Sequence, residues 1–308
     1  MKALITGGAG FIGSHIAKKF IDNDINVHVV DNLSTGKIEN IDFLKKECFF
    51  QRDINDLEYM TELLKKEQYD YVLHLAAMVS VVETIDKPFQ SNEDNITSTI
   101  NLLESIHKYV PNIKKFFFAS SAAVYGRLED LPKTIESKVD PLSPYAVQKY
   151  ASERYSKIYH DLYNVPTVSM RFFNIYGPKQ NPNSDYSGVL SILNKKFSNK
   201  ENFTFFGDGE QTRDFVYIKD LVEAVWLVIN NEDSNGKVYN LGTGSQSTLN
   251  EIFKIFEKNF GYSIPYEYKE ERLGDIKYSY AEISPLKKLG FIPSYSIEDG
   301  VSEYLNSK

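Results

Sequence analysis

Along the first half of the chain, short apolar runs typical of strands alternate with segments whose apolar residues have helical spacing. Short runs of β-branched and aromatic residues have the length of buried strands, at residues 3–6, 27–31, 71–75, 115–120 and 167–171. Between them, apolar residues recur at helical spacing, at residues 11–23, 57–66, 95–109 and 145–163. This alternation predicts βαβ units and a parallel sheet. Such sheets bind ligands at the carboxyl ends of their strands.

The pattern changes after about Asn174. The stretch YGPKQNPNSDYSG is rich in Pro, Gly and Asn and predicts a loop, and the elements beyond it follow no regular order. We therefore expect a first domain over residues 1–174 and a smaller, mixed α/β C-terminal lobe over residues 175–308. The stretch RDFVYIKDLVEAVWLVIN, within about residues 214–244, is expected to return to the first sheet.

Composition and charge limit the kinds of molecule that the protein is expected to bind. The 308 residues are 42% apolar and 25% charged, as in an ordinary globular protein. The net charge of −7 argues against nucleic acid or an anionic membrane as the main partner. The single Cys48 excludes a disulfide framework, and the histidines lack partners at metal-ligand spacing, so no metal is expected. With neither a membrane-spanning stretch nor the features of a signal peptide, we expect a cytoplasmic protein.

The first twenty residues contain a candidate phosphate-binding turn. In KALITGGAGFIGSHIAKKF, an apolar strand leads into Gly7, Gly10 and Gly13 and then into an amphipathic helix. Glycines let the backbone approach a pyrophosphate at the positive end of the helix. Asp31 stands 18 residues after Gly13, where a carboxylate accepts hydrogen bonds from a ribose and disfavours NADP. The alternative is a tight turn without a ligand, but the full order of elements favours NAD and a Rossmann-type fold.

A second candidate site lies in SPYAVQKYASERY. Tyr145 and Lys149 are four residues apart, so they share one face of the predicted helix. A lysine beside a phenol favours the phenolate and makes tyrosine a usable base. The spacing alone also occurs by chance on helix surfaces. Ser121, at the end of a buried strand, could complete the group, whereas the neighbouring Ser120 points to the other face of the strand.

Several motifs occur in a fixed order over nearly the whole chain: TGGAGFIGSH, DNLSTG, ASSAAVYG, YAVQK, RFFNIYGP, GDGEQTRDFVYIKDL, YNLGTG and RLGD. In this ordered set the chain resembles the extended short-chain dehydrogenase/reductase family, and within it the nucleotide-sugar epimerases. The resemblance implies an α/β fold with a Rossmann-type doubly wound parallel sheet and a smaller substrate lobe. It also implies NAD as cofactor and a UDP-sugar as substrate.

The resemblance assigns roles to individual residues. It implies a catalytic group of Ser121, Tyr145 and Lys149. The residues implied to bind NAD are Gly7, Gly10, Phe11, Ile12, Gly13, Asp31, Asn32, Asp53, Ile54, Leu75, Ala76, Ala77, Asn95, Tyr145 and Lys149. Those implied to bind the UDP-sugar are Ser121, Asn174, Val189, Phe206, Arg213, Arg272, Asp275 and Ser279. Two arginines suit the two phosphates, because guanidinium groups bind phosphate oxygens in pairs.

The residues after Ser121 bear on the reaction. Related dehydratases need an acidic pair there, but this chain has Ala122 and Ala123, which cannot transfer protons. We therefore predict 4-epimerisation of a UDP-hexose through a 4-keto intermediate, with Tyr145 as the base and NAD retained. In the family that the chain resembles, the position four residues after this aspartate sets the room for an N-acetyl group, and a bulky aromatic residue there excludes it. Counted from Asp275 this position is the small Ser279, although a shift of one residue onto Tyr278 or Tyr280 would reverse the inference. UDP-GlcNAc and UDP-GalNAc are therefore expected alongside UDP-Glc and UDP-Gal.

Two alternatives remain. A UDP-glucuronate 4-epimerase would use the same three catalytic residues but need a cation for the sugar carboxylate. A non-catalytic NAD-dependent binding or sensor protein could share the fold, since fold alone does not determine function. Relatives in the family pair through two long helices of each subunit, so the resemblance also implies a homodimer through residues 95–109 and 145–163.

Overall fold

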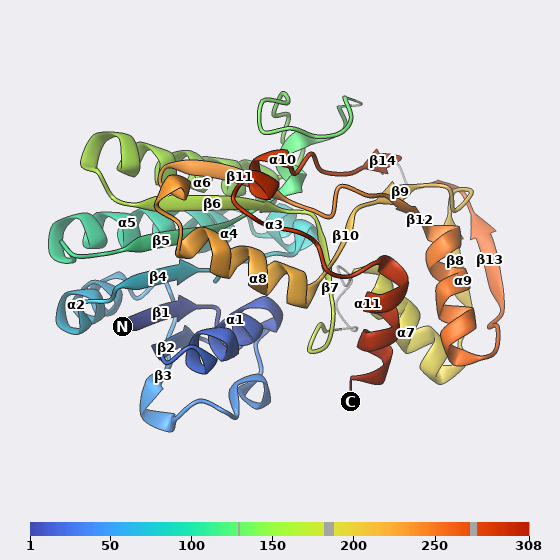
Figure 1. Ribbon diagram of the computed structural model, residues 1–308, viewed down its shortest axis with the longest axis horizontal. Coiled ribbons are helices and arrows are strands. Elements are labelled where there is room, and N and C mark those ends of the chain that lie inside the picture. The colour runs from blue at the N-terminus through green and yellow to red at the C-terminus, as the bar shows by residue number, and fades with distance from the viewer. Residues whose placement is uncertain (129, 182–187, 272–275, 308) are drawn as a thin grey trace. The chain divides into compact units, whose positions relative to one another are not determined.

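The structure is a computed structural model that describes residues 1–128, 130–181, 188–271 and 276–307 (Figure 1). The chain divides into two compact units, each built from separate segments. The first unit comprises Met1–Val124, Pro141–Arg171 and Ala224–Tyr239. The second comprises Tyr125–Asp140, Phe172–Glu223 and Asn240–Lys308. The sequence placed one boundary near Asn174 and did not separate Tyr125–Asp140, which carries no periodic pattern.

A seven-stranded sheet forms the centre of the first unit, in the order β11–β6–β5–β4–β1–β2–β3. The strands are β1 Lys2–Thr6, β2 Asn26–Asp31, β3 Phe49–Gln51, β4 Tyr71–His74, β5 Lys115–Ser121, β6 Thr167–Phe172 and β11 Lys237–Leu241. β1 runs parallel to both neighbours, with Thr6 opposite Val30 on one side and His74 on the other. The expected doubly wound parallel sheet is confirmed.

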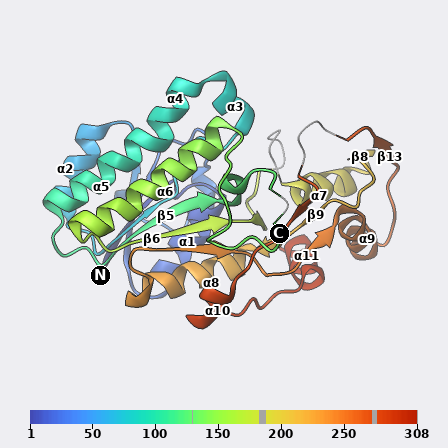
Figure 2. The same cartoon turned by 90° about the horizontal axis from the view of Figure 1, so that it is seen from above.

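Helices cover both faces of this sheet, with α2, α5 and α6 on one face and α1 and α8 on the other (Figure 2). The helices are α1 Phe11–Asp22, α2 Leu57–Glu67, α3 Val81–Asp86, α4 Pro88–Asn92, α5 Ser98–Tyr109, α6 Pro144–Tyr163 and α8 Ile218–Ile229. A π-helical turn, Glu93–Thr97, joins α4 directly to α5. Short 3₁₀ turns occupy Ile38–Ile41, Lys46–Cys48, Ala122–Tyr125 and Glu232–Ser234.

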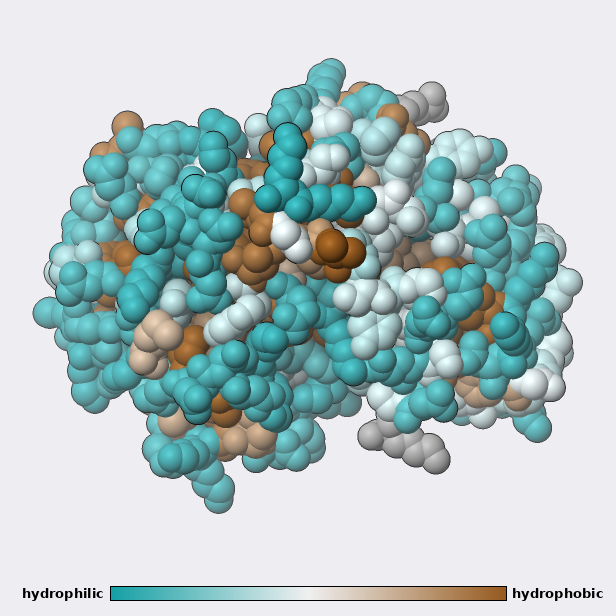
Figure 3. Space-filling view, viewed as in Figure 1, coloured by the Kyte–Doolittle hydropathy of each residue, from teal (hydrophilic) through white to brown (hydrophobic). Residues whose placement is uncertain are grey.

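The central strands are buried on both faces. Leu4 and Ile5 point to opposite sides of β1, and both are fully buried. Leu4 packs with Val72 and Phe116 on the side of α2 and α5. On the other side, the rings of Phe20 in α1 and Trp226 in α8 meet at 5.2 Å. On the face drawn in Figure 3, hydrophobic side chains reach the surface only in separate patches among hydrophilic ones.

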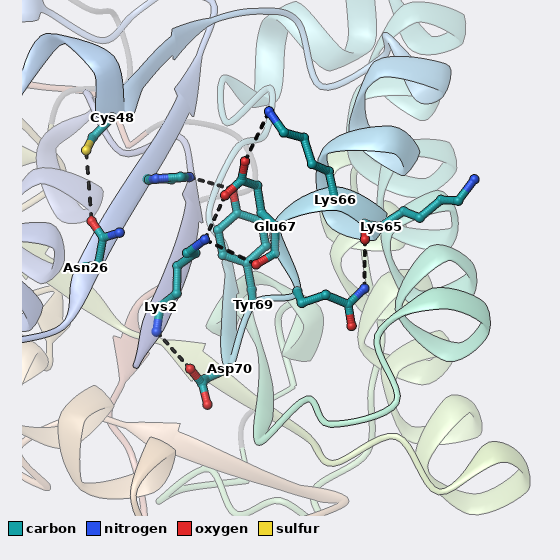
Figure 4. Close-up of polar contacts among 10 residues, drawn as sticks. Lys2, Asn26, Cys48, Lys65, Lys66, Glu67, Tyr69 and Asp70 are labelled. Carbon is teal, nitrogen blue, oxygen red and sulfur yellow. Dashed lines mark hydrogen bonds and ion pairs between the residues drawn. The ribbon is translucent and has the colours of Figure 1, made fainter.

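Polar side chains form hydrogen bonds and ion pairs near the amino ends of β1 and β4 (Figure 4). Lys2 Nζ lies 2.7 Å from the Glu67 carboxylate, and its backbone N–H donates to Asp70 Oδ2 at 2.8 Å. His28 Nδ1 shares a 2.8 Å hydrogen bond with the buried Tyr69 hydroxyl. Burial lowers the pKa of His28, which favours its neutral form. The carboxyl ends, in contrast, carry glycine, alanine and the predicted site residues.

The second unit contains three small sheets, β7–β10, β12–β9–β14 and β8–β13. Their strands are β7 Asn174–Tyr176, β8 Phe203–Phe206, β9 Thr212–Arg213, β10 Phe215–Tyr217, β12 Ser247–Thr248, β13 Tyr266–Lys269 and β14 Tyr278–Ser279. The helices are α7 Val189–Asn199, α9 Leu249–Phe260, α10 Ser284–Lys288 and α11 Ile297–Asn306. Aromatic side chains hold α7, β8 and α9 together, since Phe197 in α7 and Phe205 in β8 both pack against Phe253 in α9.

One detail of the sequence prediction was wrong. The strand in RDFVYIKDL was expected to return to the first sheet, but this segment forms β10 and pairs with β7. The strand that returns is β11, which follows α8 and lies beside β6. The error arose because both short runs are apolar, and burial alone does not reveal which partner strand buries them. Among the described residues, no helix is both long and apolar enough to cross a membrane.

Candidate active site

The glycine turn lies between the end of β1 and the start of α1. Gly7 has a positive φ of 70°, and a Cβ there would lie 2.7 Å from the backbone nitrogen of Ala76. A Cβ at Gly13 would overlap the carbonyl oxygen of Gly7. Gly10 is the N-cap of α1, so it brings no side chain to the first N–H groups of the helix. This bare, positively polarised helix end fits a pyrophosphate.

Asp31, at the carboxyl end of β2, connects the glycine turn to the following loop. Its carboxylate accepts hydrogen bonds from the backbone N–H of Ala9 at 3.0 Å and of Leu33 at 2.8 Å. Burial raises the pKa of Asp31, and these two hydrogen bonds oppose the rise. Each carboxylate oxygen retains a lone pair, so Asp31 can still accept from a ribose hydroxyl.

The other residues predicted beside the adenine end lie on neighbouring loops. Asn32 and Asp53 are exposed, and Asn32 Nδ2 donates to Asp53 Oδ2 at 2.9 Å. Ile54, which follows Asp53 in the chain, is buried. Phe11 and Ile12 open α1 and are half-buried. These positions remain predictions as cofactor contacts.

The loop after β4 is held by Asn95. Leu75, Ala76 and Ala77 are half-buried and precede Met78. The Asn95 side chain accepts from Met78 N–H at 2.8 Å and donates to Met78 O at 3.0 Å. Asn95 is 2% exposed and lies in the π-helical turn. Its predicted contact with the cofactor stays a prediction, while its contact with the loop is a structural one.

Ser121, Tyr145 and Lys149 come together on two adjacent elements, β5 and α6. Ser121 ends β5, and Tyr145 lies in the first turn of α6, after Ser143, whose hydroxyl accepts from Ala146 N–H. The Ser121 hydroxyl accepts from Ala123 N–H at 3.2 Å, and its interaction with the Tyr145 phenol opposes the rise in the pKa of that phenol. Lys149 Nζ lies 5.9 Å from the centre of the Tyr145 ring. The predicted arrangement of these three side chains is therefore present in the fold.

The electrostatics differ from the sequence prediction in one respect. Lys149 was expected to lower the pKa of Tyr145, but burial raises this pKa and only the Ser121 hydrogen bond opposes it. Lys149 instead donates to the main-chain oxygen of Ala119 at 2.9 Å, and burial lowers its own pKa to about 8. The ammonium group is directed to a carbonyl rather than to the phenol, which explains the difference.

A chain of hydrogen bonds with one fixed direction connects the loop after β4 to the π-helical turn through Thr6, His74 and Thr99. Ala76 N–H donates to Thr6 Oγ1 at 3.3 Å, and Thr6 Oγ1 lies 2.8 Å from His74 Nδ1. His74 Nε2 lies 3.0 Å from Thr99 Oγ1, which donates to Asn95 O. Since the single Thr99 proton goes to Asn95, His74 must donate from Nε2 and accept at Nδ1. Burial, with the charge of Lys149, lowers the pKa of His74 to about 3 and keeps it neutral.

A buried ion pair supports the same two elements. Glu153 in α6 accepts from Arg171 at 2.9 and 2.7 Å, and both side chains are almost fully buried. The Ser120 hydroxyl donates to Glu153 Oε2 at 2.7 Å. The expected structural role of Ser120, on the face of β5 opposite Ser121, is therefore present. Removing one member would leave a charge buried without its partner.

The second unit brings together several of the predicted substrate residues. Arg213 in β9 lies directly opposite Ser279 in β14, in parallel register. Asn174 donates through Nδ2 to the main-chain oxygen of Asp214, next to Arg213 in the chain. Phe206 lines a cavity of about 90 Å³ together with Gly207, Asp208, Gln211, Glu271 and Lys277. Gln211 Oε1 is buried and has no hydrogen-bond partner among the described residues.

Three further residues were predicted to bind the substrate: Val189, Arg272 and Asp275. Val189 is half-buried at the first position of α7. Arg272 and Asp275 lie outside the described residues. Within the described ranges, no group of three or more His, Cys, Asp or Glu side chains could hold a metal ion.

Sequence reasoning missed four polar residues that support or line these sites: His74, Gln148, Ser152 and Gln211. Gln148 and Ser152 are buried in α6 and contact Asn95. Their only signal in the sequence is a helical spacing of three from Tyr145 and Lys149. That spacing places them on a neighbouring stripe of the helix but does not identify what they meet.

The neutral state of His74 predicts an acid-sensitive fold. The pKa of His74 is 6.5 in the unfolded chain and about 3 in the folded protein. Between these two values His74 takes up a proton only on unfolding, so the free energy of unfolding decreases as the pH is lowered from 6.5 to about 3. The His74→Asn variant should have a lower free energy of unfolding than the wild type at neutral pH. When the pH is lowered from about 6.5 to 5, however, its free energy of unfolding should decrease by about 1.5 kcal/mol less than that of the wild type. Urea unfolding across this range measures the difference. The exposed His107→Asn variant is the control, and parallel curves for His74→Asn and wild type would contradict the assignment.

Comparisons with known proteins agree with this geometry. A UDP-glucose 4-epimerase from Thermotoga maritima, solved with UDP-glucose, is 36% identical with a TM-score of 0.94, covering 99% of this chain and 98% of that one. A UDP-N-acetylglucosamine 4-epimerase from Methanobrevibacter ruminantium, in complex with UDP-N-acetylmuramic acid, is 38% identical with a TM-score of 0.92, covering 99% and 97%. A UDP-glucuronic acid 4-epimerase from Bacillus cereus, in complex with NAD and a fluorinated UDP-glucuronic acid, is 31% identical with a TM-score of 0.89, covering 99% and 98%.

The family model for the NAD dependent epimerase/dehydratase family matches residues 3–242. The resemblance to extended short-chain dehydrogenase/reductases of the nucleotide-sugar epimerase type is thereby confirmed, and with it NAD as the cofactor. The glycine turn, Asp31 and the Ser121–Tyr145–Lys149 group lie within the matched residues. The chain belongs to the NAD dependent epimerase/dehydratase family.

Proposed function

We propose that the protein is an NAD-dependent UDP-sugar 4-epimerase that acts on UDP-Glc and UDP-Gal and also on UDP-GlcNAc and UDP-GalNAc. The observation that carries the proposal is the group of Ser121, Tyr145 and Lys149 at the ends of β5 and α6, in the unit that also holds the glycine turn. The relatives with the highest similarity described above are 4-epimerases of UDP-sugars.

The residues present fit NAD. The pyrophosphate would bind at the first turn of α1, where the glycines leave the backbone bare, and Asp31 would accept from the ribose. When bound, NAD⁺ supplies the hydride acceptor, and its positive charge favours ionisation of a nearby phenol. Ala76 and Ala77 would line the cofactor beyond the glycine turn, with Asn95 holding the loop that carries them.

Tyr145 would act as the base. It takes the proton of the sugar 4-hydroxyl while the C4–H bond breaks with its electron pair, and C4–O becomes a carbonyl. After the sugar turns over, Tyr145 returns the proton to this oxygen as hydride adds to the other face of C4. Ser121 would fix the sugar oxygen, because its hydroxyl ends β5 close enough to the phenol to act on the pKa of Tyr145. The buried Lys149 contributes positive charge without taking the proton itself.

Dehydration is disfavoured by the surface around Ser121. Ala122 and Ala123 follow it in a 3₁₀ turn and carry only methyl groups. Neither can protonate a leaving hydroxyl or remove a second proton from the sugar ring. The site therefore supports oxidation and reduction at one carbon, which leaves the composition of the sugar unchanged.

The second unit would hold the nucleotide end of the substrate. Arg213 would bind a phosphate, and Phe206 would contact the nucleotide from the cavity that it lines. Arg272 and Asp275 are proposed to join them on the basis of the family resemblance alone. Ser279 faces the same side of its sheet as Arg213, and the adjacent Tyr278 points the other way. This register supports room for an N-acetyl group at Ser279.

A homodimer is proposed from the apolar surface of α6. Val147, Tyr155, Ile158 and Leu162 share one face of this helix and are 38–66% exposed. Tyr109, at the end of α5, and Tyr163 add further exposed aromatic surface. A second copy of the chain would cover this surface by packing its own α5 and α6 against it.

The proposed activity predicts epimer formation from UDP-Glc and UDP-GlcNAc with no NAD added, because the cofactor is regenerated in each cycle and stays bound. Chromatography of the reaction mixture measures the product. Product from both sugars supports the role of Ser279. Product from UDP-glucuronate alone would favour the uronate epimerase instead, and no product even after NAD is added would contradict the proposal.

Tyr145→Phe should lower kcat by about 10²–10⁴-fold, because it removes the proton acceptor. Binding of the UDP-sugar, measured by calorimetry, should change little. The matched control is Tyr150→Phe, a half-buried tyrosine in the same helix. A non-catalytic sensor would show no turnover in the wild type and equal ligand binding in both variants.

The dimer predicts that Leu162→Glu yields a monomer, since a carboxylate cannot be buried in an apolar interface without a large cost. Sedimentation of the wild type should give twice the mass of one chain. Ile292→Glu, at a position that is 77% exposed outside α5 and α6, is the control and should leave the mass unchanged. A monomeric wild type would refute the proposed pairing.

A further inference from the structure

Helix α6 carries two neighbouring pairs of residues, and the two members of each pair are one helical turn apart. Tyr145 and Lys149 form the first pair, and Gln148 and Ser152 form the second. Gln148 is 4% exposed and Ser152 is fully buried, so both side chains lie inside the first unit. The proposed function uses the first pair and leaves the second without a role.

Both members of the second pair bind Asn95. Asn95 Nδ2 donates to Gln148 Oε1 at 2.7 Å, and Ser152 Oγ donates to the main-chain oxygen of Asn95 at 2.6 Å. The Gln148 amide is fixed from its other end, because its Nε2 donates to Ser91 Oγ at 2.8 Å. Three neutral, fully engaged hydrogen bonds in a buried setting hold one orientation strongly.

Asn95 passes this constraint to the loop after β4. Its side-chain amide pairs with both the N–H and the carbonyl of Met78, the residue directly after Leu75–Ala77. Its backbone lies in the π-helical turn, a widened turn of the kind often found at functional sites. A single buried asparagine therefore joins the helix that carries Tyr145 and Lys149 to the loop expected to line the cofactor.

We propose that Gln148 and Ser152 are positioning residues that, through Asn95, set the placement of Tyr145 and Lys149 relative to the cofactor-lining loop. This inference rests on the proposed function for its effect on turnover. Reactions of this type require the reacting groups to be held within a fraction of an ångström, and a misplacement of about 1 Å can cost about 100-fold in rate.

The helix supplies a matched control. Ser156 lies one turn beyond Ser152 on α6, is equally buried, and its hydroxyl donates to the Ser152 carbonyl within the same helix. Ser152→Ala and Ser156→Ala thus remove the same atom from the same helix, and only the first removes a bond to Asn95. Gln148→Met keeps the side-chain length and removes both hydrogen bonds of the side-chain amide.

The test measures kcat and KM for the UDP-sugar together with amide hydrogen exchange of residues 75–80. Ser152→Ala should lower kcat about tenfold and Gln148→Met about 100-fold, with KM within about twofold, as expected for lost alignment rather than lost binding. Ser156→Ala should stay within about twofold of the wild type. Exchange in residues 75–80 should rise in Ser152→Ala and Gln148→Met and not in Ser156→Ala.

Equal effects of Ser152→Ala and Ser156→Ala on kcat and on exchange would overturn the proposal. If the wild type is inactive on every UDP-sugar, the proposed function fails, but the exchange measurement still decides whether Gln148 and Ser152, through Asn95, hold residues 75–80 in place. The ultraviolet difference spectrum between each variant and its Tyr145→Phe double variant adds a readout of phenol ionisation. A shift in Gln148→Met and none in Ser156→Ala supports positioning, whereas equal shifts oppose it.

Discussion

The buried ammonium group of Lys149 is the constraint on which the first unit depends. A charge taken out of water is costly unless polar groups surround it, and here the carbonyl of Ala119 accepts its hydrogen bond while the ring faces of Phe118 and Tyr145 lie within 6 Å. The carbonyl must therefore remain available at this end of β5. This requirement fixes how α6 packs on the strand, and with it the place of Tyr145.

A second cation cannot be tolerated beside the first. His74 lies deeper in the same unit, and its neighbours fix it as a neutral ring that donates from Nε2. Neutral polar groups, rather than charges, then carry the connection from β1 through β4 to Asn95 and α6. The charged pair that the unit does bury, Glu153 with Arg171, is matched in geometry and further bonded by Ser120. The Lys149 ammonium and the Glu153–Arg171 pair are thus each compensated by polar partners.

The sequence was sufficient for features that depend on local pattern. Five strands of the main sheet, β1, β2, β4, β5 and β6, were predicted to within one residue because buried strands are short, apolar and separated by helical periodicity, whereas β3 and β11 were not predicted as strands. Gly7 and Gly13 were recognisable because only glycine fits where a Cβ would strike backbone. The triad of Ser121, Tyr145 and Lys149 followed from a strand end and a helical spacing, although the direction of the Tyr145 pKa shift did not.

Features that depend on long-range partners were not predictable. Gln148 and Ser152 look like ordinary polar residues of a helix, and their role appears only when Asn95, more than 50 positions earlier, is placed against them. The same holds for β10, which pairs with β7 although its apolar run is compatible with the main sheet. Arg213 and Ser279 are likewise brought together by strand register, which single-residue patterns do not encode.

The proposed 4-epimerase activity oxidises and reduces one carbon of the sugar without releasing the hydrogen. The most direct measurement uses a UDP-sugar carrying deuterium at C4, incubated with the enzyme in ordinary water and analysed by mass spectrometry after the epimers have equilibrated. The account predicts that the product epimer retains the deuterium at C4, because the hydride returns to the carbon it left. Loss of the label to solvent would contradict it, since the hydrogen would then have left as a proton.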